Sequence, residues 1–519
     1  MLELHTPVQA AQWLQGRVTG TLQTDSRQVR AGDGFIAWPG ATTDGRRFVT
    51  AAITQGASAC LVEHQDVDRF EFGADRIATC KGLKTASGPI AAAYFGQPSQ
   101  HLDVIAITGT NGKTSTAWWL AHSLSNLELH APIPCGLVGT FGIGSPEKQA
   151  PGRVAIEPLA NGLTTPDPIL LQRNLRDFVN DGVQACALEA SSIGIEEHRL
   201  DGTRIHTAVF TNFTQDHLDY HGSMQAYWQA KAALFRWPGL RAAVVNVDDE
   251  KGRELAESLG DLAPQSGMDV WTVSCSAAAR LRAENIHYGA SGLAFEVLET
   301  REGMAERQAL NTRLIGQYNV SNLLCVIAAM RALGVPLAAC IDSAKNQLPV
   351  PGRMECLGGQ GMPMAVVDYA HTPDALDKTL QALRALALQR GGQLWCIFGC
   401  GGDRDSTKRA LMGEMAAHLA DHVVVTNDNP RSEAPQAIAD QILSGLAGHG
   451  SVQVQLDRAR AISDVLHGAA VDDVVLVAGK GHENYQEIGG VRRPFSDQAE
   501  AARSLRNWSA KLPGQGVSA

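Results

Sequence analysis

The chain has 519 residues, of which 44% are hydrophobic and 19% are charged, and its net charge is −10. A chain of this length normally divides into several domains, and this composition is typical of a globular enzyme. The negative net charge argues against a general nucleic-acid-binding protein, which normally presents a basic surface.

Three further features bear on where the protein works. The sequence contains no run of about eighteen apolar residues, so we expect no membrane span. Its first residues lack the basic start and apolar core of a secretory signal peptide. The ten cysteines are scattered without a CxxC pair, and most lie in apolar stretches. We therefore expect reduced cysteines and a cytoplasmic location.

The first two blocks of the chain differ in pattern. Residues 1–98 combine short strand-like pieces with glycine turns, which predicts a small N-terminal α/β domain. Residues 99–345 alternate strand and helix patterns, which predicts a central P-loop-type domain with a mostly parallel, doubly wound sheet. We expect this alternation to continue to about residue 345. The predicted strands include 104–108, 185–188, 207–210 and 242–247.

A second alternating block, residues 346–519, predicts a C-terminal Rossmann-like α/β domain. Each of its predicted strands runs into a polar or glycine-rich loop. Ligands of open α/β sheets bind outside the carboxyl ends of the strands, so we expect these loops to gather at one edge. The predicted strands are 365–369, 394–399, 422–427 and 474–479.

The stretch DVIAITGTNGKTSTAWWL, residues 103–120, has the pattern of a strand, a tight glycine turn and a helix. The backbone N–H groups of such a turn and the helix dipole attract phosphate. We expect Lys113 to hold the β- and γ-phosphates and Thr114 to place its hydroxyl on Mg²⁺. The common P-loop has a glycine where this chain has Ile107, so the loop is a shortened variant, and an ordinary strand–helix turn is the alternative. The candidate ATP-binding residues of the turn are Gly109, Thr110, Asn111, Gly112, Lys113 and Thr114.

Glu189 and His217 each follow a predicted strand. If both strands neighbour the strand before the glycine turn, the two side chains can reach the γ-phosphate side of a nucleotide. A carboxylate and an imidazole suit one or two divalent ions beside phosphate oxygens. Considered alone, Glu189 is equally well an anion at a helix N-terminus and His217 a loop histidine.

Lys231 lies on an apolar helix face together with Tyr227, Leu234 and Phe235. A lysine in such a position is expected to be neutralised, paired or chemically altered. By spacing alone, the favoured interpretation is a lysine whose ammonium group reaches solvent along its aliphatic stem.

Together these segments resemble the Mur ligases, the ATP-dependent amino-acid ligases of peptidoglycan precursor synthesis. The matching stretches follow the family order from about residue 100 to 486, and the N-terminal TDSRQVRAGDGFIAWPG resembles members that add the third residue. The stretches are ITGTNGKTS, LEASS, FTNFTQDHLDYHG, YWQAKAALF, AVVNVDDE, LIGQYNVSN, VPGRME, VDYAHTPDAL, FGCGGDRD, TNDNPR and AGKGHENYQ.

The resemblance implies a three-domain enzyme: residues 1–98 bind the UDP end of a substrate, 99–345 bind ATP, and 346–519 bind an amino acid. It implies that ATP phosphorylates the D-glutamyl carboxylate of UDP-N-acetylmuramoyl-L-alanyl-D-glutamate and that the amine of meso-2,6-diaminopimelate attacks the acyl phosphate. It also implies that Lys231 is carbamylated and helps to hold Mg²⁺. The expected catalytic residues are Lys113, Glu189, His217 and Lys231, and the expected metal ligands are Thr114, Glu189, His217 and carbamylated Lys231.

The resemblance further implies contacts with nucleotide and with the UDP-linked substrate. Taken alone, these residues would be assigned to loop caps, turns and surface pairs. The additional ATP-binding candidates are Asn319, Arg353, Asp368 and His371. The UDP-substrate candidates are Asp25, Ser26, Arg27, Thr164, Thr165, Ser191 and Arg199.

The segment Asp428–Arg431 indicates which amino acid is used. Its proline restricts the turn, so that Arg431 can grip the distal carboxylate of diaminopimelate in a bidentate manner. Lysine has no such carboxylate and would leave the arginine desolvated, at a cost of about 3–5 kcal/mol, which is a discrimination of at least about a hundredfold. A type I turn with a surface arginine is the alternative. The diaminopimelate-binding candidates are Arg404, Asp428, Asn429, Arg431, Gly479 and Glu483.

Two rival functions stay open at this point. One is a sister ligase that adds L-lysine or another amino acid, or a folylpolyglutamate-type synthetase. The other is a non-catalytic ATP-binding module. Two departures from the family pattern occur, Ile193 where histidine is common and Ala410 where proline is usual. We expect small-molecule substrates, a monomer and no nucleic-acid partner.

Overall fold

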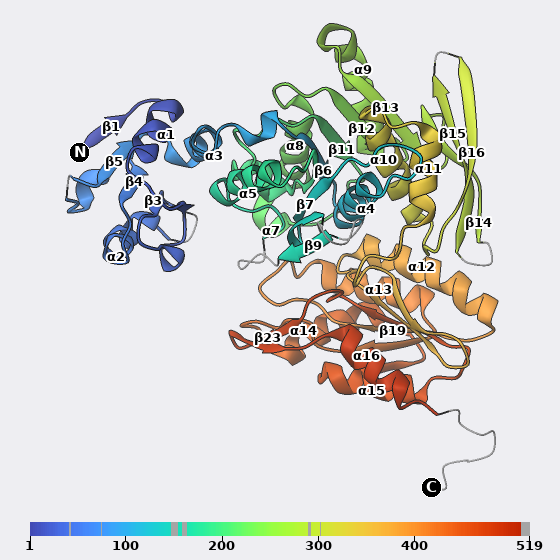
Figure 1. The fold of residues 1–519 in the computed structure, drawn as a ribbon. Coiled ribbons are helices and arrows are strands. Elements are labelled where there is room, and N and C mark those ends of the chain that lie inside the picture. Colours follow the sequence, from blue (N-terminus) through green and yellow to red (C-terminus); the bar gives the residue numbers. More distant parts are fainter. Residues whose placement is uncertain are drawn as a thin grey trace.

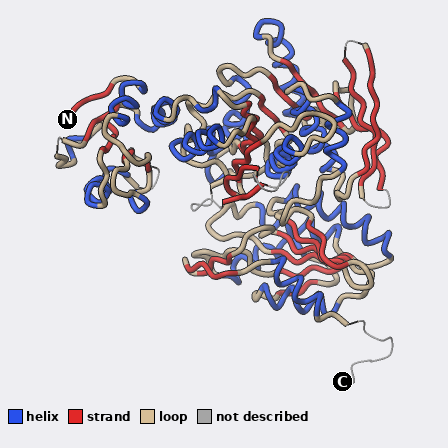
Figure 2. The backbone as a smooth tube through the Cα atoms, viewed as in Figure 1, coloured by secondary structure: helices blue, strands red, loops and turns tan. Residues whose placement is uncertain are grey.

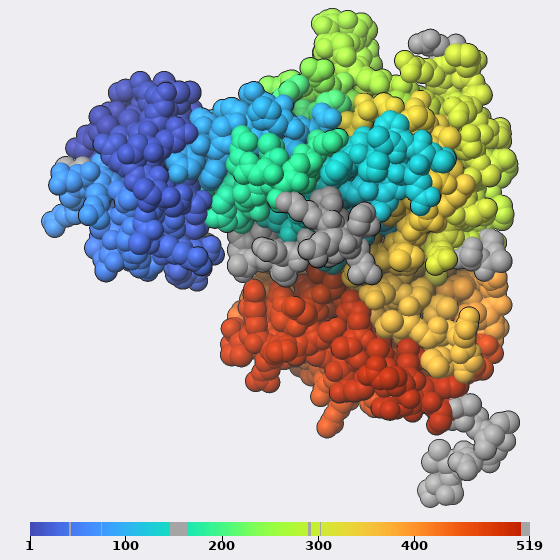
Figure 3. Space-filling view, in the orientation of Figure 1, coloured from blue at the N-terminus to red at the C-terminus, as the bar shows by residue number. Residues whose placement is uncertain are grey.

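The computed structural model describes residues 1–40, 43–73, 75–146, 154–157, 163–288, 292–301 and 303–509. Figure 1 shows three α/β units: the N-terminal unit lies to one side of the middle unit, and the C-terminal unit lies beneath the middle one. Figure 3 shows the N-terminal unit projecting from the rest of the molecule. The predicted three-domain α/β architecture is confirmed in its fold class.

The N-terminal unit is built on a parallel sheet with strand order β1-β5-β4-β3-β2. Successive residues of β4 alternate between two clusters, since Leu61 faces the helices α1 and α3 while Cys60 and Val62 pack on the other side. The bounds are β1 Leu2–Leu4, β2 Leu22–Gln23, β3 Gly34–Ala37, β4 Ala59–Glu63, β5 Ile77–Cys80, α1 Pro7–Gln15, α2 Val49–Thr54 and α3 Leu83–Tyr94.

The middle unit has a long sheet with the order β16-β15-β14-β13-β12-β11-β6-β10-β7-β8-β9 among the described residues (Figure 2). The strand before the glycine turn, β6, is central, and both of its neighbours carry candidate ligands at their ends. The bounds are β6 Asp103–Thr108, β7 Cys135–Gly139, β8 Gly142–Pro146, β9 Val154–Glu157, β10 Ala185–Glu189, β11 Thr207–Phe210, β12 Ala242–Asn246, β13 Asp269–Ser274, β14 Leu281–Tyr288, β15 Leu293–Arg301 and β16 Met304–Asn311.

One expectation for this unit is wrong. The strand–helix alternation does not run unbroken to residue 345, because β14, β15 and β16 pair antiparallel and form a ribbon at the sheet edge. Leu293, Phe295 and Val297 of β15 join the core, but Ala294 and Leu298 are buried as well, whereas most of β16 is exposed. Burial alternates with a period of two only along the first half of β14, so the three strands share no uniform alternating pattern.

Helices cover both faces of the central sheet. Ile105 and Ile107 of β6 pack with α4 and α10, while Val104 and Ala106 pack on the face that carries α5. Strands buried on both faces account for the nearly continuous apolar sequence of β6. The bounds are α4 Lys113–Ser125, α5 Pro168–Asn180, α6 Ser192–Glu196, α7 Leu218–His221, α8 Met224–Ala232, α9 Glu250–Ser266, α10 Tyr318–Ala332 and α11 Leu337–Lys345.

The C-terminal unit has the strand order β17-β18-β22-β19-β20-β21, in which only the pairing of β17 with β18 is antiparallel among the described strands. The four predicted strands correspond to β18, β19, β20 and β22. The bounds are β17 Glu355–Gly358, β18 Met364–Asp368, β19 Leu394–Phe398, β20 His422–Val425, β21 Val452–Val454, β22 Val474–Ala478, β23 Tyr485–Ile488, β24 Val491–Pro494, α12 Pro373–Arg390, α13 Lys408–Leu419, α14 Pro435–Leu443, α15 Arg458–Gly468 and α16 Asp497–Arg506.

A buried ion pair braces the carboxyl edge of this sheet. The Arg458 guanidinium donates to both carboxylate oxygens of Asp497 at 2.7 Å, and both side chains are 0% exposed. The same guanidinium donates to the carbonyl oxygen of Ala478 at 2.9 Å, at the end of β22. The pair thereby fixes the strand end from which one of the candidate loops starts.

We expect Asp497→Ala to lower the free energy of unfolding by about 3–5 kcal/mol, because it leaves a buried arginine without its counter-charge. Urea denaturation measures the loss. Arg460→Ala is the matched control, since its ion pair with Asp457 is exposed and such pairs contribute about 0–1 kcal/mol. If Asp497→Ala and Arg460→Ala both lower the free energy of unfolding by the same small amount, the Arg458–Asp497 pair does not stabilise the sheet.

Two further observations concern the whole described chain. No helix within the described ranges is both long and apolar enough to cross a membrane. The ten cysteines are free thiols, and eight of them are buried.

Candidate active site

The glycine turn after β6 is held tightly against the loop that follows β11. Gly109 and Gly112 have φ values of +146° and +86°, where a side chain would be strained. A Cβ on Gly109 would lie 1.9 Å from Thr211 Oγ1, and a Cβ on Gly112 would lie 2.4 Å from Asn322 Oδ1. The turn therefore requires glycine at both positions, and its backbone leads directly into the N-terminus of α4.

Glu189 lies beside the start of α4, because β10 is the direct neighbour of β6. Its Oε2 accepts hydrogen bonds from the hydroxyls of Thr114 at 2.9 Å and Thr140 at 3.0 Å, and its Oε1 accepts from the Thr140 backbone N–H at 2.8 Å. The carboxylate is only 1% exposed at residue level. These contacts fix an anion at the mouth of the phosphate loop.

The candidates Thr164, Thr165, Ser191 and Arg199 form a second layer behind Glu189. Thr165 Oγ1 donates to the Glu189 carbonyl oxygen at 2.7 Å and lies 3.0 Å from Ser191 Oγ. Arg199 donates to the Thr165 carbonyl oxygen at 3.0 Å, and Thr164 Oγ1 lies 3.2 Å from Thr140 Oγ1. The structure thus brings these four residues to the same edge as the phosphate loop.

Lys231 is buried beneath the phosphate loop rather than reaching solvent. It is 1% exposed, its Nζ donates to the Gly109 carbonyl oxygen at 2.7 Å, and it lies 4.4 Å from the ring centre of Tyr227. Burial, together with the nearby Lys113, holds the pKa of the Lys231 amine well below its ordinary value. A lowered pKa increases the fraction of the amine in its neutral form, which is the form that can react with carbon dioxide.

Lys113 folds back over the same loop, where its Nζ donates to the carbonyl oxygens of Gly109 at 3.0 Å and Thr110 at 2.9 Å. Burial lowers the pKa of Lys113, although Glu189 and Asp216 act in the opposite direction. The lysine therefore lies within electrostatic range of carboxylates from both strands that flank β6.

A carboxylate that the sequence interpretation missed, Asp216, connects the middle and C-terminal units. Its Oδ2 lies 3.5 Å from His217 Nε2 and 3.8 Å from His371 Nε2, and His371 belongs to the C-terminal unit. Burial would raise the pKa of Asp216, but His217, His371 and Lys408 hold it below its usual value. The sequence signal that could have identified Asp216 is its position directly before His217, in the tripeptide QDH.

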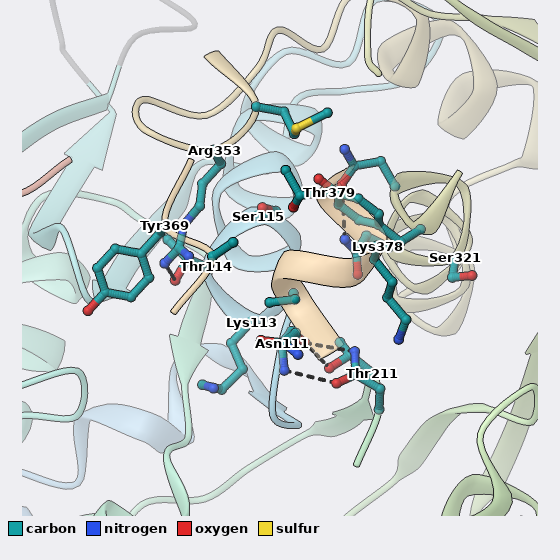
Figure 4. A pocket seen from close by; sticks show the side chains of 18 of the residues that line it. Asn111, Lys113, Thr114, Ser115, Thr211, Ser321, Arg353, Tyr369, Lys378 and Thr379 are labelled. Carbon is teal, nitrogen blue, oxygen red and sulfur yellow. Dashed lines mark hydrogen bonds between the residues drawn. The ribbon is translucent and has the colours of Figure 1, made fainter. Parts of the chain in front are cut away.

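A cavity of about 770 Å³ opens at the junction of the two units and contains the phosphate loop (Figure 4). Arg353 points toward the start of α4, with its Nη2 3.3 Å from Thr114 Oγ1, and its guanidinium lies 4.2 Å from the ring centre of Tyr369. Asn111 of the loop donates to Asp374 of α12 at 3.2 Å. The ATP candidates Asn319, Arg353, Asp368 and His371 all line this cavity.

The Asp368 side chain is hydrogen-bonded to backbone N–H groups within that cavity. Its carboxylate accepts hydrogen bonds from the N–H groups of Met354 and Ala370, both at 2.8 Å. Burial raises the pKa of Asp368, although Arg353 opposes the shift. Asp368 therefore ties the 350–354 loop to the end of β18.

The amino-acid candidates gather at the ends of β19, β20 and β22. Asn429 Nδ2 donates to Glu483 Oε2 at 2.8 Å, and a Cβ on Gly479 would lie 2.6 Å from Asp428 Oδ2. Arg431, with φ +52°, donates to the Gly402 carbonyl oxygen at 2.6 Å. Arg404 is exposed beside this group. None of these six residues lines the 770 Å³ cavity, so they form a separate cluster.

Lys480 lies at the centre of that cluster and was also missed. It is 0% exposed, and its Nζ donates to Glu483 Oε2 at 2.7 Å and to Asn429 Oδ1 at 3.0 Å. Asn429 Oδ1 accepts a second hydrogen bond, from the Glu487 N–H at 3.0 Å. The lysine between two glycines in AGKGHE was the available signal. The amide group of Asn429 is thus hydrogen-bonded within the protein. Glu483 Oε1, in contrast, accepts no hydrogen bond from the described residues.

The Asp25–Arg27 segment lies in the N-terminal unit, away from the phosphate loop (Figure 1). Asp25 caps a short turn and pairs with Arg27 at 2.7 Å. Arg27 lines a second cavity of about 700 Å³, together with Arg30 and with Arg173 of α5, whereas Asp25 and Ser26 do not line it. Arg173 is a further cation at this junction that sequence reasoning did not single out.

The predicted metal ligands fit Mg²⁺ in part. Mg²⁺ prefers oxygen donors in an octahedral arrangement, and the Thr114 hydroxyl and Glu189 carboxylate supply them 2.9 Å apart. Lys231 as an amine offers no oxygen. Within the described ranges, no group of three His, Cys, Asp or Glu side chains is gathered as a metal site. Nucleotide phosphates and a carbamate would have to complete the coordination.

The buried His482 is expected to make the free energy of unfolding depend on pH. Burial, aided by Arg353 and Lys480, lowers its pKa to about 3, compared with about 6.5 in an unfolded chain. Between these values the unfolded state binds a proton that the folded state does not, so the free energy of unfolding falls as the pH falls below about 6.5. We expect this fall to be smaller in His482→Phe, as measured by urea denaturation at pH 7, 6 and 5. If the free energy of unfolding changes with pH by the same amount in the wild type and in His482→Phe, the lowered pKa of His482 is not the cause.

The units that carry the phosphate loop and the charged cluster match known protein families. The family model for the Mur ligase middle domain matches residues 107–330, that for the Mur ligase glutamate ligase domain matches 352–481, and that for the Mur ligase family catalytic domain matches 20–81. The chain belongs to the Mur ligase family.

Its relatives carry one specific name. The chain is 56% identical to the UDP-N-acetylmuramoyl-L-alanyl-D-glutamate–2,6-diaminopimelate ligase of Acidovorax sp. (strain JS42), over 97% of both chains. It is 45% identical to the enzyme of that name from Janthinobacterium sp. (strain Marseille), over 93% of this chain and 94% of the relative. A solved structure of a ligase with the same name is 33% identical, with a TM-score of 0.62 over 94% of each chain.

Proposed function

We propose that this ligase uses ATP to join meso-2,6-diaminopimelate to the D-glutamyl carboxylate of UDP-N-acetylmuramoyl-L-alanyl-D-glutamate, in peptidoglycan precursor synthesis. Relatives of that name cover nearly the full chain at up to 56% identity. The observation that carries the proposal is the pairing of two sites in one chain: a phosphate loop with Glu189 and Lys231 beneath it, and a charged cluster around Asp428, Arg431 and Glu483.

The chemistry requires that a carboxylate become an electrophile. Transfer of the γ-phosphoryl group to the D-glutamyl carboxylate gives an acyl phosphate with a good leaving group. The N–H groups of the turn, Lys113 and Arg353 stabilise the negative charge that develops on the phosphoryl oxygens. Mg²⁺, held by Thr114, Glu189, His217 and a carbamate on Lys231, would neutralise charge on the nucleotide when bound.

The second half of the reaction is amide formation. The amine of the amino acid attacks the acyl carbon, and the tetrahedral intermediate expels phosphate. Holding the amine next to the acyl phosphate removes much of the entropic barrier. The Thr164, Thr165, Ser191 and Arg199 group, which lies beside Glu189, is proposed to contact the UDP-linked substrate, and the Asp25–Arg27 segment is proposed to contact its UDP end.

Selectivity for diaminopimelate is proposed to rest on the C-terminal cluster. Arg431 would pair with the distal carboxylate, with Arg404 adding positive charge. Glu483 and Asp428 would accept the distal ammonium group. The free Oε1 of Glu483 supports this assignment, because Lys480 and Asn429 both use Oε2.

An assay of ADP release across amino acids tests the proposal. With UDP-N-acetylmuramoyl-L-alanyl-D-glutamate and ATP present, we expect kcat/KM for meso-diaminopimelate to exceed that for L-lysine by at least about a hundredfold. Equal values would favour the sister lysine-adding ligase. No release with any amino acid would favour a non-catalytic ATP-binding module.

We also propose that the enzyme acts as a monomer in the cytoplasm, where ATP is available. The free, mostly buried cysteines support a reducing compartment. Gel filtration with light scattering tests the oligomeric state.

A further inference from the structure

The loop that carries Lys480 and Glu483 also reaches back to the middle unit through His482. The His482 ring centre lies 4.5 Å from that of Phe141, in the turn between β7 and β8, and 5.3 Å from that of Tyr369, after β18. Distances of this size are typical of packed aromatic rings. His482 is therefore an aromatic contact between the two units that flank the nucleotide cavity.

Two glycines bring three loops together at this point. A Cβ on Gly352 would lie 2.2 Å from the His482 backbone nitrogen. A Cβ on Gly481 would lie 2.7 Å from the Gly352 carbonyl oxygen and 2.8 Å from Tyr369 Cβ. Both glycines have positive φ, at +65° and +51°. The backbone at residue 482 is thus held against the 350–353 and 369–371 loops, with little freedom to move on its own.

Each of the two rings packed against His482 is connected to a residue that contacts the phosphate loop or Glu189. Phe141 follows Thr140, whose N–H and hydroxyl hold the Glu189 carboxylate. Tyr369 packs under Arg353, whose guanidinium contacts the Thr114 hydroxyl.

On the other side, the residue after His482 is Glu483, which is bonded to Lys480 and Asn429. One ring thus lies between the residues that hold the amino-acid cluster and those that support the phosphate loop.

The imidazole makes this contact without a hydrogen bond from Nδ1. That atom is buried and has no partner in the described structure. The pKa of His482, lowered to about 3 mainly by burial, leaves the ring neutral at pH 7. A neutral ring whose Nδ1 is unpaired acts here chiefly through its packing, with its plane tilted by 54° to Phe141 and by 38° to Tyr369, so a phenyl ring of similar shape can replace it.

We propose that His482 is a positioning residue that sets the amino-acid cluster against the phosphate loop through its aromatic packing against Phe141 and Tyr369. This inference rests on the proposed function. It assigns His482 no proton transfer and no direct contact with the reacting atoms. Its effect is on the alignment of amine and acyl phosphate, where a displacement of about 1 Å costs about a hundredfold in rate.

The test compares His482→Phe with His482→Ala by ADP release at pH 7. We expect the phenylalanine variant to keep kcat within about threefold of the wild type. We expect the alanine variant to lose about tenfold to a hundredfold in kcat, while KM for ATP stays within about twofold. Phe141→Leu, which removes the partner ring from the other unit, is expected to reproduce the loss in kcat and serves if His482→Ala folds poorly.

Three outcomes would overturn the proposal. Equal loss in the phenylalanine and alanine variants would mean that a ring nitrogen is required. Near-normal kcat in both His482→Ala and Phe141→Leu would mean that the aromatic packing has no positioning role. Parallel rises in every KM would indicate general damage to the fold. A failure of the proposed function would be seen in a different experiment, the assay of the wild-type enzyme with different amino acids. The His482 and Phe141 variants are compared with the wild type on whichever amino acid the wild type uses, so their result does not depend on that outcome.

Discussion

Replacing Lys231 by alanine or by methionine is expected to lower kcat by about a hundred- to a thousandfold, the cost typical of losing one preorganised electrostatic group at the reacting centre. The amine is buried under the phosphate loop, and its lowered pKa increases the fraction in the neutral form. Carbon dioxide can then convert it to a carbamate, which supplies anionic oxygens to Mg²⁺. Neither replacement side chain can form a carbamate. Steady-state ADP release measures the loss.

Methionine is the more informative of the two changes, because it fills nearly the same volume and limits the cavity that alanine leaves. Added bicarbonate is not expected to restore either variant, whereas small carboxylic acids are expected to restore part of the activity by occupying the ligand position. Lys251→Ala is the matched control, since Lys251 is paired with Glu254 at an exposed position. A methionine variant with more than about a tenth of wild-type kcat would refute the carbamate role.

Arg431→Ala is expected to reduce kcat/KM for diaminopimelate by about thirtyfold or more, with KM for ATP nearly unchanged. Truncating one member of a buried charge pair costs about 2–5 kcal/mol, because the partner is left desolvated. Arg431 is half-buried, its φ of +52° is fixed by pairing with the β23 strand, and its guanidinium is anchored on Gly402. The head group is therefore preorganised for a carboxylate.

The control for Arg431 is Arg460→Ala, an exposed arginine of the same domain. L-lysine provides a second control: its poor turnover should change little in Arg431→Ala, because it has no carboxylate to lose. If KM for ATP and for diaminopimelate rise together, Arg431 serves the domain junction and not the amino acid.

Much of the site's framework could be predicted from sequence because buried parallel strands have near-continuous apolar sequences. The strand before Gly109 and four of the six described strands of the C-terminal sheet were predicted within a residue or two; β17 and β21 were not predicted. The expectation that Glu189 and His217 reach the same side of a nucleotide was conditional on their strands being neighbours of β6. The order β11-β6-β10 meets that condition.

The remaining features depend on contacts between distant segments. The β14–β16 ribbon was missed because β15 is buried at nearly every position up to Glu299 and β16 is mostly exposed, so neither strand shows the alternation that predicts a half-buried strand. Asp216 meets His371 across two units, and Lys480 meets Asn429 across 51 positions of sequence. Spacing along one element cannot reveal such partners. Burial of Lys231 likewise contradicts the solvent-reaching interpretation that spacing alone favoured.

The connection between the middle and C-terminal units is fastened to the helix that starts at the phosphate loop. Trp119 Nε1 donates to the Leu348 carbonyl oxygen at 2.9 Å, and Gln347 donates to Ser123 Oγ at 3.0 Å. A rotation that opens the C-terminal unit would pivot next to these bonds. Arg353 comes only five residues after Leu348, and its guanidinium lies 3.3 Å from the hydroxyl of Thr114 at the start of the same helix. The anchored connection would thus keep Arg353 beside the phosphate loop during such a rotation, whereas the side of the cavity lined by Asp368 and His371 would move with the C-terminal unit.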